Sequence, residues 1–249
     1  MNDSMSQSVK SILSTARQRG PYDRTISVSS RSLKKAIETK HKSSQIPIIA
    51  ELKPTSPSGD HSRDLDPVTA AQKMSKAGAA AISVLTEPTH FNGSLDALTK
   101  VRNNVDIPVL RKDFILYEDH LDAVEADIIL LIVRFLEESL ETMLEAAHHR
   151  GFDVLVETHT EDEIQTAIAA GADYIGINNR DLTDLQVDLS TFEGLAHFVP
   201  SDITLIAESG LHSHSDVQRM IEAGADAVLI GNAIMDGNIE QNIQELLGS

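Results

Sequence analysis

Cysteine and tryptophan are both absent from this chain of 249 residues, and basic residues are scarce. Without cysteine the chain has no disulfide, no thiolate nucleophile and no cysteine-ligated zinc site. Lysine and arginine number 21 against 38 aspartates and glutamates, which gives a formal net charge of -17. Nucleic acids and anionic membranes require a basic face that releases counterions, so neither is an expected partner. A small anionic ligand would have to be held by local positive groups.

Long apolar runs and a leader segment are also missing. No run approaches the roughly 20 residues of a membrane-spanning helix, although 41% of the residues are hydrophobic. The first residues, MNDSMSQSVK, lack the basic stretch and apolar core of a secretory signal. We therefore expect a globular protein of the cytoplasm with no membrane partner. The acidity suits either high-salt surroundings or an ordinary acidic cytosolic protein, and the sequence leaves both open.

From Ile46 onward, short β-branched runs alternate with amphipathic stretches, a pattern typical of βαβ units and a parallel sheet. The runs predict strands at residues 47–52, 80–85, 108–111, 127–133, 153–156, 174–177, 204–207 and 227–230. A helix is expected after each strand, and a closing helix is expected near residues 239–247. This arrangement predicts a TIM (β/α)8 barrel, an α/β fold for which about 250 residues is a usual single-domain length.

An internal repeat supports the barrel. Its five copies run from a helix end through a small residue into a strand: KAGAAAISVL, EADIILLIV, HRGFDVLVE, AAGADYIGIN and EAGADAVLIG. Glycine suits this joint because it ends a helix in the left-handed conformation without a Cβ clash. Residues 1–44 are polar and only partly periodic, which predicts an N-terminal helical extension on a barrel of residues 45–249. A doubly wound open sheet is the alternative, but no glycine-rich dinucleotide loop follows the first strand.

Polar side chains gather where the predicted strands end, which is where a barrel of this kind forms its active site. These residues are Glu51, Lys53, Lys112, Asp113, Glu157, Asn178, Arg180, Glu208 and Ser209. Solvated loop charges or structural ion pairs are the alternative for any single one. Complementary acids and bases at five strand ends favour an active site instead. Lysines beside carboxylates in a partly desolvated mouth can donate protons, and an opposed glutamate can accept one, without a metal or an organic cofactor.

Two glycine-containing loops predict a phosphate site in the same mouth. The segment AESGL offers Ser209 and Gly210 after the seventh strand, and LIGNAIM offers Gly231 and Asn232 after the eighth, before a short helical segment. Exposed backbone N–H groups and a helix N-terminus favour an anion at such a place. Ordinary turns are the alternative for these glycines. A small phosphorylated molecule is the expected ligand.

The histidines give weaker signals. His212 and His214 in LHSHSD could be a metal pair, but a spacing of two does not place two ligands on one helix face. Ser213 and Asp216 match a helix capping box, which we prefer as the interpretation. His159 is expected to support the site rather than to touch the ligand. No metal site is predicted.

The segments IIAELKPTSPSG, AISVLTEPTHFNGS, PVLRKDFI, LLIV, VLVETH, IGINNRDL, AESGL and VLIGNAIM follow one another in the chain. In this order they resemble indole-3-glycerol phosphate synthase, a TIM-barrel family of tryptophan biosynthesis, over residues 46–235. The resemblance implies a carboxy-lyase that converts 1-(2-carboxyphenylamino)-1-deoxyribulose 5-phosphate to indole-3-glycerol phosphate, with loss of carbon dioxide and water. It implies no cofactor.

The resemblance also implies a role for each residue of the site. Lys112 would be the general acid that polarises the substrate carbonyl, while Glu157 and Lys53 would serve later proton transfers. Glu51 would orient Lys53, and Asn178 would position the substrate hydroxyls. Which lysine acts at which step stays open. The contacts to the substrate and its phosphate would come from Ser56, Phe91, Phe114, Leu130, Arg180, Glu208, Ser209, Gly210, Gly231 and Asn232.

Within that set, Phe91, Phe114 and Leu130 would enclose the anthranilate ring, although core packing is the alternative for the two phenylalanines. Arg180 would meet an anionic group of the substrate. Ser209 and Gly210 would hold the phosphate together with the loop after the eighth strand.

The chain departs from the family pattern at three places. Pro54 and Thr55 stand where many relatives carry two basic residues, and Asn232 replaces a small hydroxyl residue. The N-terminal extension has no tryptophan, so an indole lid is not expected.

Two other functions compete with the synthase. Phosphoribosylanthranilate isomerase needs a cysteine, which this chain lacks. A catalytically silent barrel that binds a phosphorylated ligand would not need the acid and base residues. A purely structural role explains none of the strand-end pattern. We expect a monomer.

Overall fold

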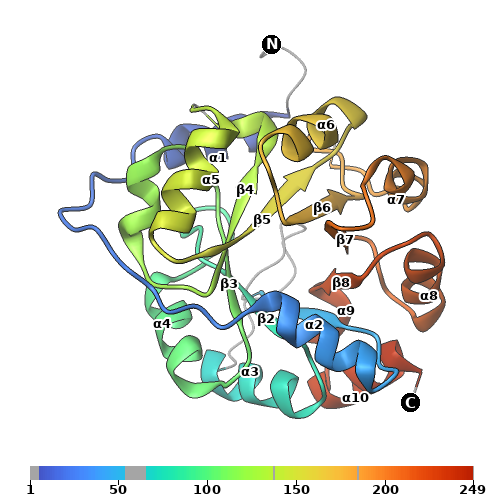
Figure 1. The fold of residues 1–249 in the computed structure, drawn as a ribbon. Coiled ribbons are helices and arrows are strands. Elements are labelled where there is room, and N and C mark those ends of the chain that lie inside the picture. The colour runs from blue at the N-terminus through green and yellow to red at the C-terminus, as the bar shows by residue number, and fades with distance from the viewer. Residues whose placement is uncertain (1–5, 54–65, 137, 184, 249) are drawn as a thin grey trace.

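The chain forms a closed barrel of parallel strands in a computed structural model, which describes residues 6–53, 66–136, 138–183 and 185–248 (Figure 1). The strands follow one another around the barrel in chain order. They are β1 (Ile48–Leu52), β2 (Ala81–Leu85), β3 (Val109–Lys112), β4 (Ile128–Ile132), β5 (Asp153–Thr158), β6 (Tyr174–Asn178), β7 (Thr204–Glu208) and β8 (Ala227–Ile230). The predicted TIM barrel is confirmed, and the open sheet is wrong because β1 pairs with β8 through Ile49 and Leu229.

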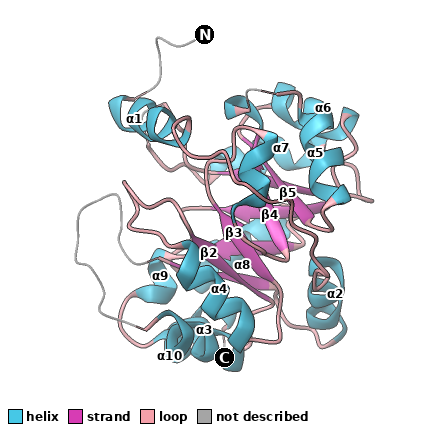
Figure 2. Ribbon diagram, turned by 90° about the vertical axis from the view of Figure 1, so that its left-hand side faces the viewer, coloured by secondary structure: helices cyan, strands magenta, loops and turns pink. Residues whose placement is uncertain are grey.

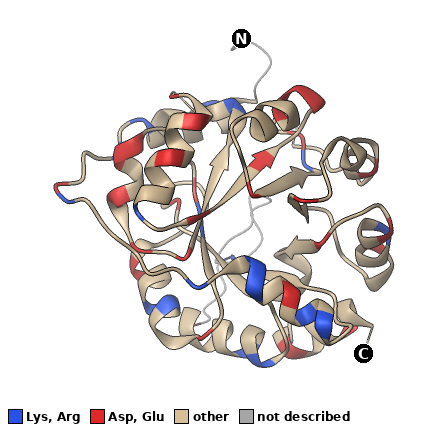
Figure 3. Ribbon diagram, viewed as in Figure 1, with Lys and Arg blue, Asp and Glu red and all other residues tan. Residues whose placement is uncertain are grey.

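Helices surround the barrel (Figure 2). Those between and after the strands are α3 (Pro67–Lys76), α4 (Leu95–Asn104), α5 (Leu140–His149), α6 (Glu161–Ala169), α7 (Ser190–Leu195), α8 (His214–Glu222), α9 (Asn232–Met235) and α10 (Ile239–Leu247). Short 3-10 helices also occur, at η1 (Glu118–Ala123), η2 (Val133–Phe135) and η3 (Ala196–Phe198). In Figure 3 acidic and basic residues colour many of these outer helices and the loops between them. No described helix is both long and apolar enough to cross a membrane.

The expected α-helix after β3 is wrong. The whole connection from β3 to β4 is described, and its only helix is the 3-10 turn η1. Side chains from elsewhere take the backbone carbonyls that an α-helix would use internally: Arg111 Nη1 donates to the carbonyl of His120 at 2.7 Å, and Arg24 Nη2 donates to that of Ala123 at 3.1 Å. The barrel core and the N-terminal extension therefore decide the shape of this connection.

The predicted N-terminal extension is helical, with α1 (Gln7–Ala16) and α2 (Leu33–Lys42) at opposite ends of the barrel (Figure 2). The α2 end lies against the beginnings of the strands, because the N–H of Leu33 donates to Asp153 and the N–H of Lys34 donates to the Tyr174 hydroxyl. The α1 end lies over the carboxyl ends of the strands, and its buried face consists of Val9, Ile12, Leu13 and Ala16.

Glycine makes the helix-to-strand joints possible, as expected. Gly78, Gly151, Gly171 and Gly224 all have positive φ, the left-handed conformation that L side chains rarely adopt. At Gly151 the space is also lacking, because a Cβ would lie 2.1 Å from the carbonyl oxygen of Val28 in the extension. The repeated joint thus aligns successive strands and leaves room for the extension to pack.

Two apolar layers hold the barrel together. Strand residues that point inward form the centre, and those that point outward pack under the helices, which explains the nearly continuous apolar runs in sequence. The inner layer includes Ile49, Leu110, Leu130, Leu155, Ile206 and Leu229. Because both faces are buried, the rigid sheet fixes where the polar residues at its carboxyl end can point.

Candidate active site

A cavity of about 300 Å³ opens at the carboxyl end of the barrel, with α1 as one wall. Most of the predicted site residues line it: Glu51, Lys53, Phe91, Lys112, Phe114, Leu130, Glu157, Asn178, Arg180, Ser209, Gly210, Gly231 and Asn232. Glu208 is not among its lining residues. Ser56 lies outside the described residues, as do Pro54 and Thr55.

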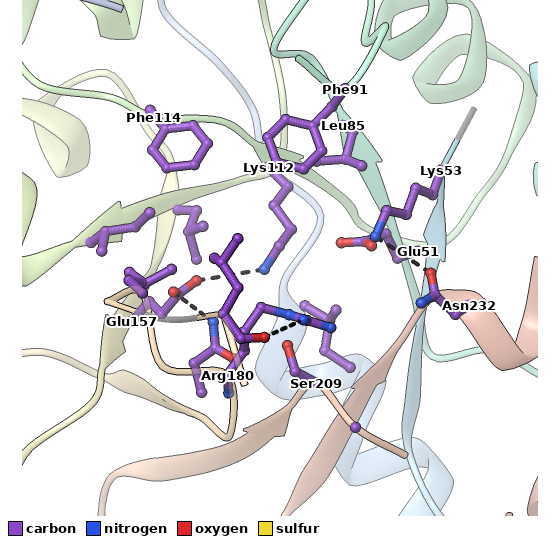
Figure 4. A pocket seen from close by; sticks show the side chains of 18 of the residues that line it. Glu51, Lys53, Leu85, Phe91, Lys112, Phe114, Glu157, Arg180, Ser209 and Asn232 are labelled. Atoms are coloured by element: carbon purple, nitrogen blue, oxygen red, sulfur yellow. Dashed lines mark hydrogen bonds and ion pairs between the residues drawn. The ribbon is translucent and has the colours of Figure 1, made fainter. Parts of the chain in front are cut away.

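The ammonium of Lys112 occupies the centre of the polar half of the cavity (Figure 4). Its Nζ lies 2.8 Å from Oε2 of Glu208 and 3.5 Å from Oε2 of Glu157, so β3, β7 and β5 each contribute one member. Burial lowers the pKa of Lys112, but the charges of Glu208, Glu157 and Glu51 outweigh burial and raise that pKa above its ordinary value. Lys112 is therefore a cation at neutral pH, placed to donate a proton or to stabilise a developing oxyanion.

The carboxylate of Glu157 has two differently bound oxygens. Oε1 accepts a hydrogen bond from Nδ2 of Asn178 at 2.8 Å, whereas Oε2 is the oxygen near Lys112. Burial raises the pKa of Glu157, but Lys112, followed by His159 and Asn178, lowers it more, and the net shift is downward. The Oδ1 of Asn178 accepts the N–H of Arg180 at 2.9 Å. Both ends of the Asn178 amide are thus engaged, and this side chain orients Glu157.

Glu208, expected among the substrate contacts, lies behind Lys112 and is fully buried. Its other oxygen, Oε1, has no hydrogen-bond partner among the described residues. Burial raises the pKa of Glu208 to about 7, and the charge of Glu157 adds to this although Lys112 opposes it. The carboxylate fits only because Gly176 of β6 has no side chain, since a Cβ there would lie 2.1 Å from Oε1. A glycine inside a strand indicates such a close approach. Gly176 could therefore have indicated in sequence that a side chain from a neighbouring strand packs against β6.

The second lysine, Lys53, lies at the end of β1 beside the loop that follows β8 (Figure 4). Its Nζ donates to Oδ1 of Asn232 at 3.4 Å. The carboxylate of Glu51 packs over Gly231, where a Cβ would lie 2.6 Å from Oε1. The asparagine that replaces the usual hydroxyl residue therefore links the expected phosphate loop to Lys53.

The two expected phosphate loops border the same cavity. Ser209 and Gly210 have φ values of 66° and 83°, so the backbone after β7 turns sharply through two successive left-handed residues. Gly231 and Asn232 lie at the start of α9 in the neighbouring loop. The geometry brings together the four residues that the sequence predicted for an anion.

The opposite wall is aromatic and aliphatic. The rings of Phe91 and Phe114 stack with centroids 6.2 Å apart and an interplanar angle of 23°, and both line the cavity with Leu130. Sequence reasoning missed the contribution of α1, whose Val9 and Ile12 complete this wall. The apolar periodicity of the extension was visible, but nothing in it told which end of the barrel the helix would cover.

Asp113 turned out to be a structural ion-pair residue, the alternative considered for strand-end charges. Its Oδ1 lies 2.6 Å from Nη1 of Arg19, and its Oδ2 lies 2.9 Å from Nη2 of Arg111 and accepts the Thr86 hydroxyl at 2.7 Å. Arg19 also donates to the carbonyl of Phe114 at 2.8 Å. Asp113 thereby anchors the extension beside Lys112.

The capping box at α8 is confirmed, because the Ser213 hydroxyl and the Asp216 carboxylate bond each other's backbone N–H groups. Nδ1 of His214 lies 2.9 Å from the carbonyl oxygen of Leu246, so this ring faces α10. Within the described part of the chain, no group of three or more His, Asp or Glu side chains is arranged to hold a metal ion.

Comparisons with known proteins point to one family. The family model of indole-3-glycerol phosphate synthase matches residues 3–246. The chain is 55% identical over 250 residues to the indole-3-glycerol phosphate synthase of Haloarcula marismortui, which covers 98% of this chain and 92% of that protein. It is 51% identical over 246 residues to that of Halobacterium salinarum, with 99% and 98% covered.

More distant solved structures share the fold. The chain resembles thiamine phosphate pyrophosphorylase from Pyrococcus furiosus with a TM-score of 0.61 and 19% identity, over 81% of this chain and 93% of that chain. It resembles N-acetylmannosamine-6-phosphate 2-epimerase from Clostridium perfringens with a TM-score of 0.58 and 17% identity, over 76% and 87%. At such identities the likeness concerns the barrel alone.

Proposed function

The chain belongs to the indole-3-glycerol phosphate synthase family, the carboxy-lyases that close the indole ring in tryptophan biosynthesis, and we propose how its barrel mouth divides that reaction among its side chains. The observation that carries the proposal is the Lys112 ammonium, held between the carboxylates of Glu208 and Glu157 at the edge of the cavity. A fixed cation with a carboxylate beside it is the pair that a cyclisation and dehydration requires.

The substrate, a carboxyphenylamino-deoxyribulose phosphate, has one end for each wall of the cavity. Its phosphate binds the loops after β7 and β8, at Ser209, Gly210, Gly231 and Asn232, with Ser56 as a further contact. Its aromatic ring lies against Phe91, Phe114 and Leu130, and Arg180 meets an anionic group. The sugar chain between the two ends then passes Lys112.

The chemistry follows from the bonds that change. The ring carbon that bears the carboxylate attacks the keto carbon, and Lys112 donates a proton to the keto oxygen. Carbon dioxide leaves with its bonding electrons returned to the ring, which restores aromaticity. The new hydroxyl then leaves as water with a second donated proton, while a base removes a proton from the neighbouring methylene. An ionised substrate thus takes up one net proton from solvent, and no redox step is involved.

Glu157 is the base in this proposal, and its Oε2 is the reacting oxygen because Oε1 is bound by Asn178. Lys53 donates the second proton. Asn232 accepts a hydrogen bond from its ammonium, and Glu51 orients it. Lys112 acts first because its ammonium, which Glu208 and Glu157 keep protonated, lies directly beside the proposed base. Exchange of the two lysine roles is the alternative within this scheme.

The decisive test is a fluorescence assay of the purified chain with the carboxyphenylamino-deoxyribulose phosphate substrate. The chain has no tryptophan, so the protein itself adds no indole emission to the signal of the product. Appearance of the product without added metal or cofactor supports the proposal. Tight binding of the substrate without turnover would instead favour the silent phosphate-binding barrel.

Variants separate the site from the fold. Glu157→Gln keeps the shape of the side chain and the Asn178 contact but removes the base, so turnover should fall by about 10²–10⁴-fold. Lys35→Ala, on an exposed position of α2 at the far end of the barrel, is the matched control and should keep full turnover. Full activity of Glu157→Gln would overturn the role of this residue.

The proposal also covers the oligomeric state of the protein and its location in the cell. We take the chain to act as a monomer in the cytoplasm, which suits a site built within one barrel. Light scattering should give a mass near 27.1 kDa. A dimer mass, or activity that depends on protein concentration, would contradict the monomer, and recovery of the activity in a membrane fraction would contradict the location.

A further inference from the structure

His159 is a buried histidine that lies just behind the proposed base and does not line the cavity. It follows β5, and its side chain is 4% exposed. Its Nε2 lies 3.3 Å from Oε1 of Glu157, and its Nδ1 lies 3.4 Å from Oε2 of Glu163, in the first turn of α6. The backbone N–H of His159 donates to the same Glu163 oxygen at 2.6 Å. Each ring nitrogen thus faces a carboxylate.

This arrangement favours the doubly protonated ring. A neutral imidazole donates through one nitrogen and would turn a lone pair toward the second carboxylate, whereas an imidazolium donates through both nitrogens. Within the described residues neither ring nitrogen makes a hydrogen bond, so the two carboxylates face the ring as ion-pair partners at 3.3 and 3.4 Å. Burial lowers the pKa of His159, but its contacts with Glu157 and Glu163 outweigh burial, and the net shift is upward.

Other charged groups around the ring fit this state. Nε of Arg134, in η2, donates to Oε1 of Glu163 at 2.7 Å and holds that carboxylate from the solvent side. Its positive charge lowers the pKa of His159, but the two carboxylates outweigh it. Asp181, in the loop after β6, is a third anion close enough for His159 to lower its pKa. The surroundings of the ring are therefore anionic on balance.

We propose that His159 is a positioning residue of the reaction: as a buried imidazolium, fixed from outside by Glu163, it holds one oxygen of Glu157 and so presents the other to Lys112 and the substrate. This inference rests on the proposed role of Glu157 as the base. It explains why Oε1 of Glu157 faces away from the cavity, where it accepts a hydrogen bond from Asn178 and lies 3.3 Å from the His159 ring, while Oε2 lies 3.5 Å from Lys112 Nζ. The carboxylate cannot rotate away from the cavity without breaking both contacts.

A purely structural role is the alternative, because Glu163 also belongs to the N-terminal cap of α6, where Thr160 accepts its N–H. In that case His159 would close the cap, its charge would not matter, and Glu157 would behave the same without it. The two readings differ in the protonation of one ring, which can be measured without turnover.

The first experiment is a pH titration of the protein with isotope-labelled histidine rings, followed by NMR. The chain has ten histidines, and the signal of His159 is the one absent in His159→Asn, or the one displaced in Glu163→Gln if His159→Asn does not fold. We expect the ring to stay protonated above the ordinary pKa of about 6.5. Glu163→Gln should lower its pKa by about one unit or more, because an opposite charge is removed.

The matched control is Glu161→Gln, which removes the same charge from the same first turn of α6 but at an exposed position. It should leave the His159 titration within a few tenths of the wild-type value. A wild-type ring that is neutral at pH 7, or equal responses to Glu163→Gln and Glu161→Gln, would overturn the imidazolium.

The second experiment follows kcat and KM against pH. Because the imidazolium is lost as pH rises through the His159 pKa, wild-type kcat should fall on the alkaline side at the pH where the NMR signal titrates. Glu163→Gln should move this fall to lower pH, and Glu161→Gln should not. His159→Asn should lower kcat at pH 7 by roughly 10- to 100-fold, because Glu157 is no longer held toward the substrate and a misplaced reacting group costs up to about 10²-fold, with KM nearly unchanged.

The outcomes distinguish this inference from the proposed function. An active Glu157→Gln variant would refute the base and with it the whole assignment. A dead Glu157→Gln variant, combined with a folded His159→Asn variant of wild-type kcat and wild-type pH profile, would keep the base and refute the positioning role.

Discussion

Removal of the Arg19 guanidinium should loosen α1 from the mouth of the barrel. Arg19 follows α1 and reaches Oδ1 of Asp113 at 2.6 Å and the carbonyl of Phe114 at 2.8 Å. These residues come directly after Lys112 at the end of β3. Because α1 forms a wall of the cavity, the first consequence of Arg19→Ala should be weaker substrate binding rather than slower chemistry.

The free energy that Arg19→Ala removes from the docking of α1 can be worked out from the two hydrogen bonds that are lost. A hydrogen bond to a charged group contributes about 1.5–3 kcal/mol, but Arg19 is 16% exposed and Asp113 keeps its contacts with Arg111 and Thr86. We therefore expect a loss of about 2 kcal/mol in the docking of α1, or roughly 30-fold in its docking equilibrium. The apolar face of α1 remains, so the helix should still dock, but the undocked fraction should grow enough to weaken substrate binding.

The contribution of the Arg19–Asp113 pair to the docking of α1 depends on the ionisation of Asp113. Burial raises the pKa of Asp113, but the charges of Arg111 and Arg19 outweigh it and bring the pKa to about 2, below the ordinary 3.8. A lowered pKa means that the contribution of the pair is fully present above the ordinary value and is lost as pH falls toward 2. The effect of Arg19→Ala should therefore be the same at pH 6 and pH 8.

Hydrogen exchange of residues 7–16 and steady-state kinetics are the assays. Exchange in α1 should become faster, KM should rise, and kcat should change less than KM. Arg19→Lys should give an intermediate result because it keeps the charge but not the two-pronged contact. Lys10→Ala, on the exposed face of α1, is the control. Unchanged exchange together with an unchanged KM in Arg19→Ala would refute the reasoning.

Three further predictions test the site and the surface. Lys112→Met should lower turnover by about 10²–10⁴-fold. It also leaves buried Glu208 without its cation and raises the pKa of Glu208 further above about 7, so the loss of stability relative to the wild type should grow as pH rises. A melting-temperature difference that shrinks toward high pH would contradict this. Gly176→Ala should cost about 1–3 kcal/mol and displace Glu208, whereas Gly194→Ala, where a Cβ meets nothing within 4 Å, should be harmless; equal unfolding curves for the two variants would contradict the crowding at Gly176. If the net charge of -17 reflects adaptation to salt, the melting temperature should rise steeply up to about 1 M salt as self-repulsion is screened, and a flat profile would count against it.

The barrel and most of its mouth were predictable because local pattern encodes them. Alternating strand and helix periods located every strand, and the glycine joints marked the passages between them. Once the strands are known to be parallel and closed, residues at their carboxyl ends such as Glu51, Lys112 and Asn178 must meet at one edge. The absence of an α-helix after β3 was not predictable, because Arg111 of β3 and Arg24 of the N-terminal extension take carbonyls of that connection.

What the sequence by itself determined is therefore the kind of element at each place and the set of polar groups that share one end of the barrel. Tertiary structure alone decided the partners within that set. Arg19 and Asp113 are 94 positions apart, and Lys112 and Glu208 are 96 positions apart. Such contacts have no local signature, because they arise only when barrel closure brings the strands and the extension together. The distinction between Asp113 as an anchor and Glu157 as a proposed base comes from those contacts, since the two residues look alike at the end of a strand in sequence.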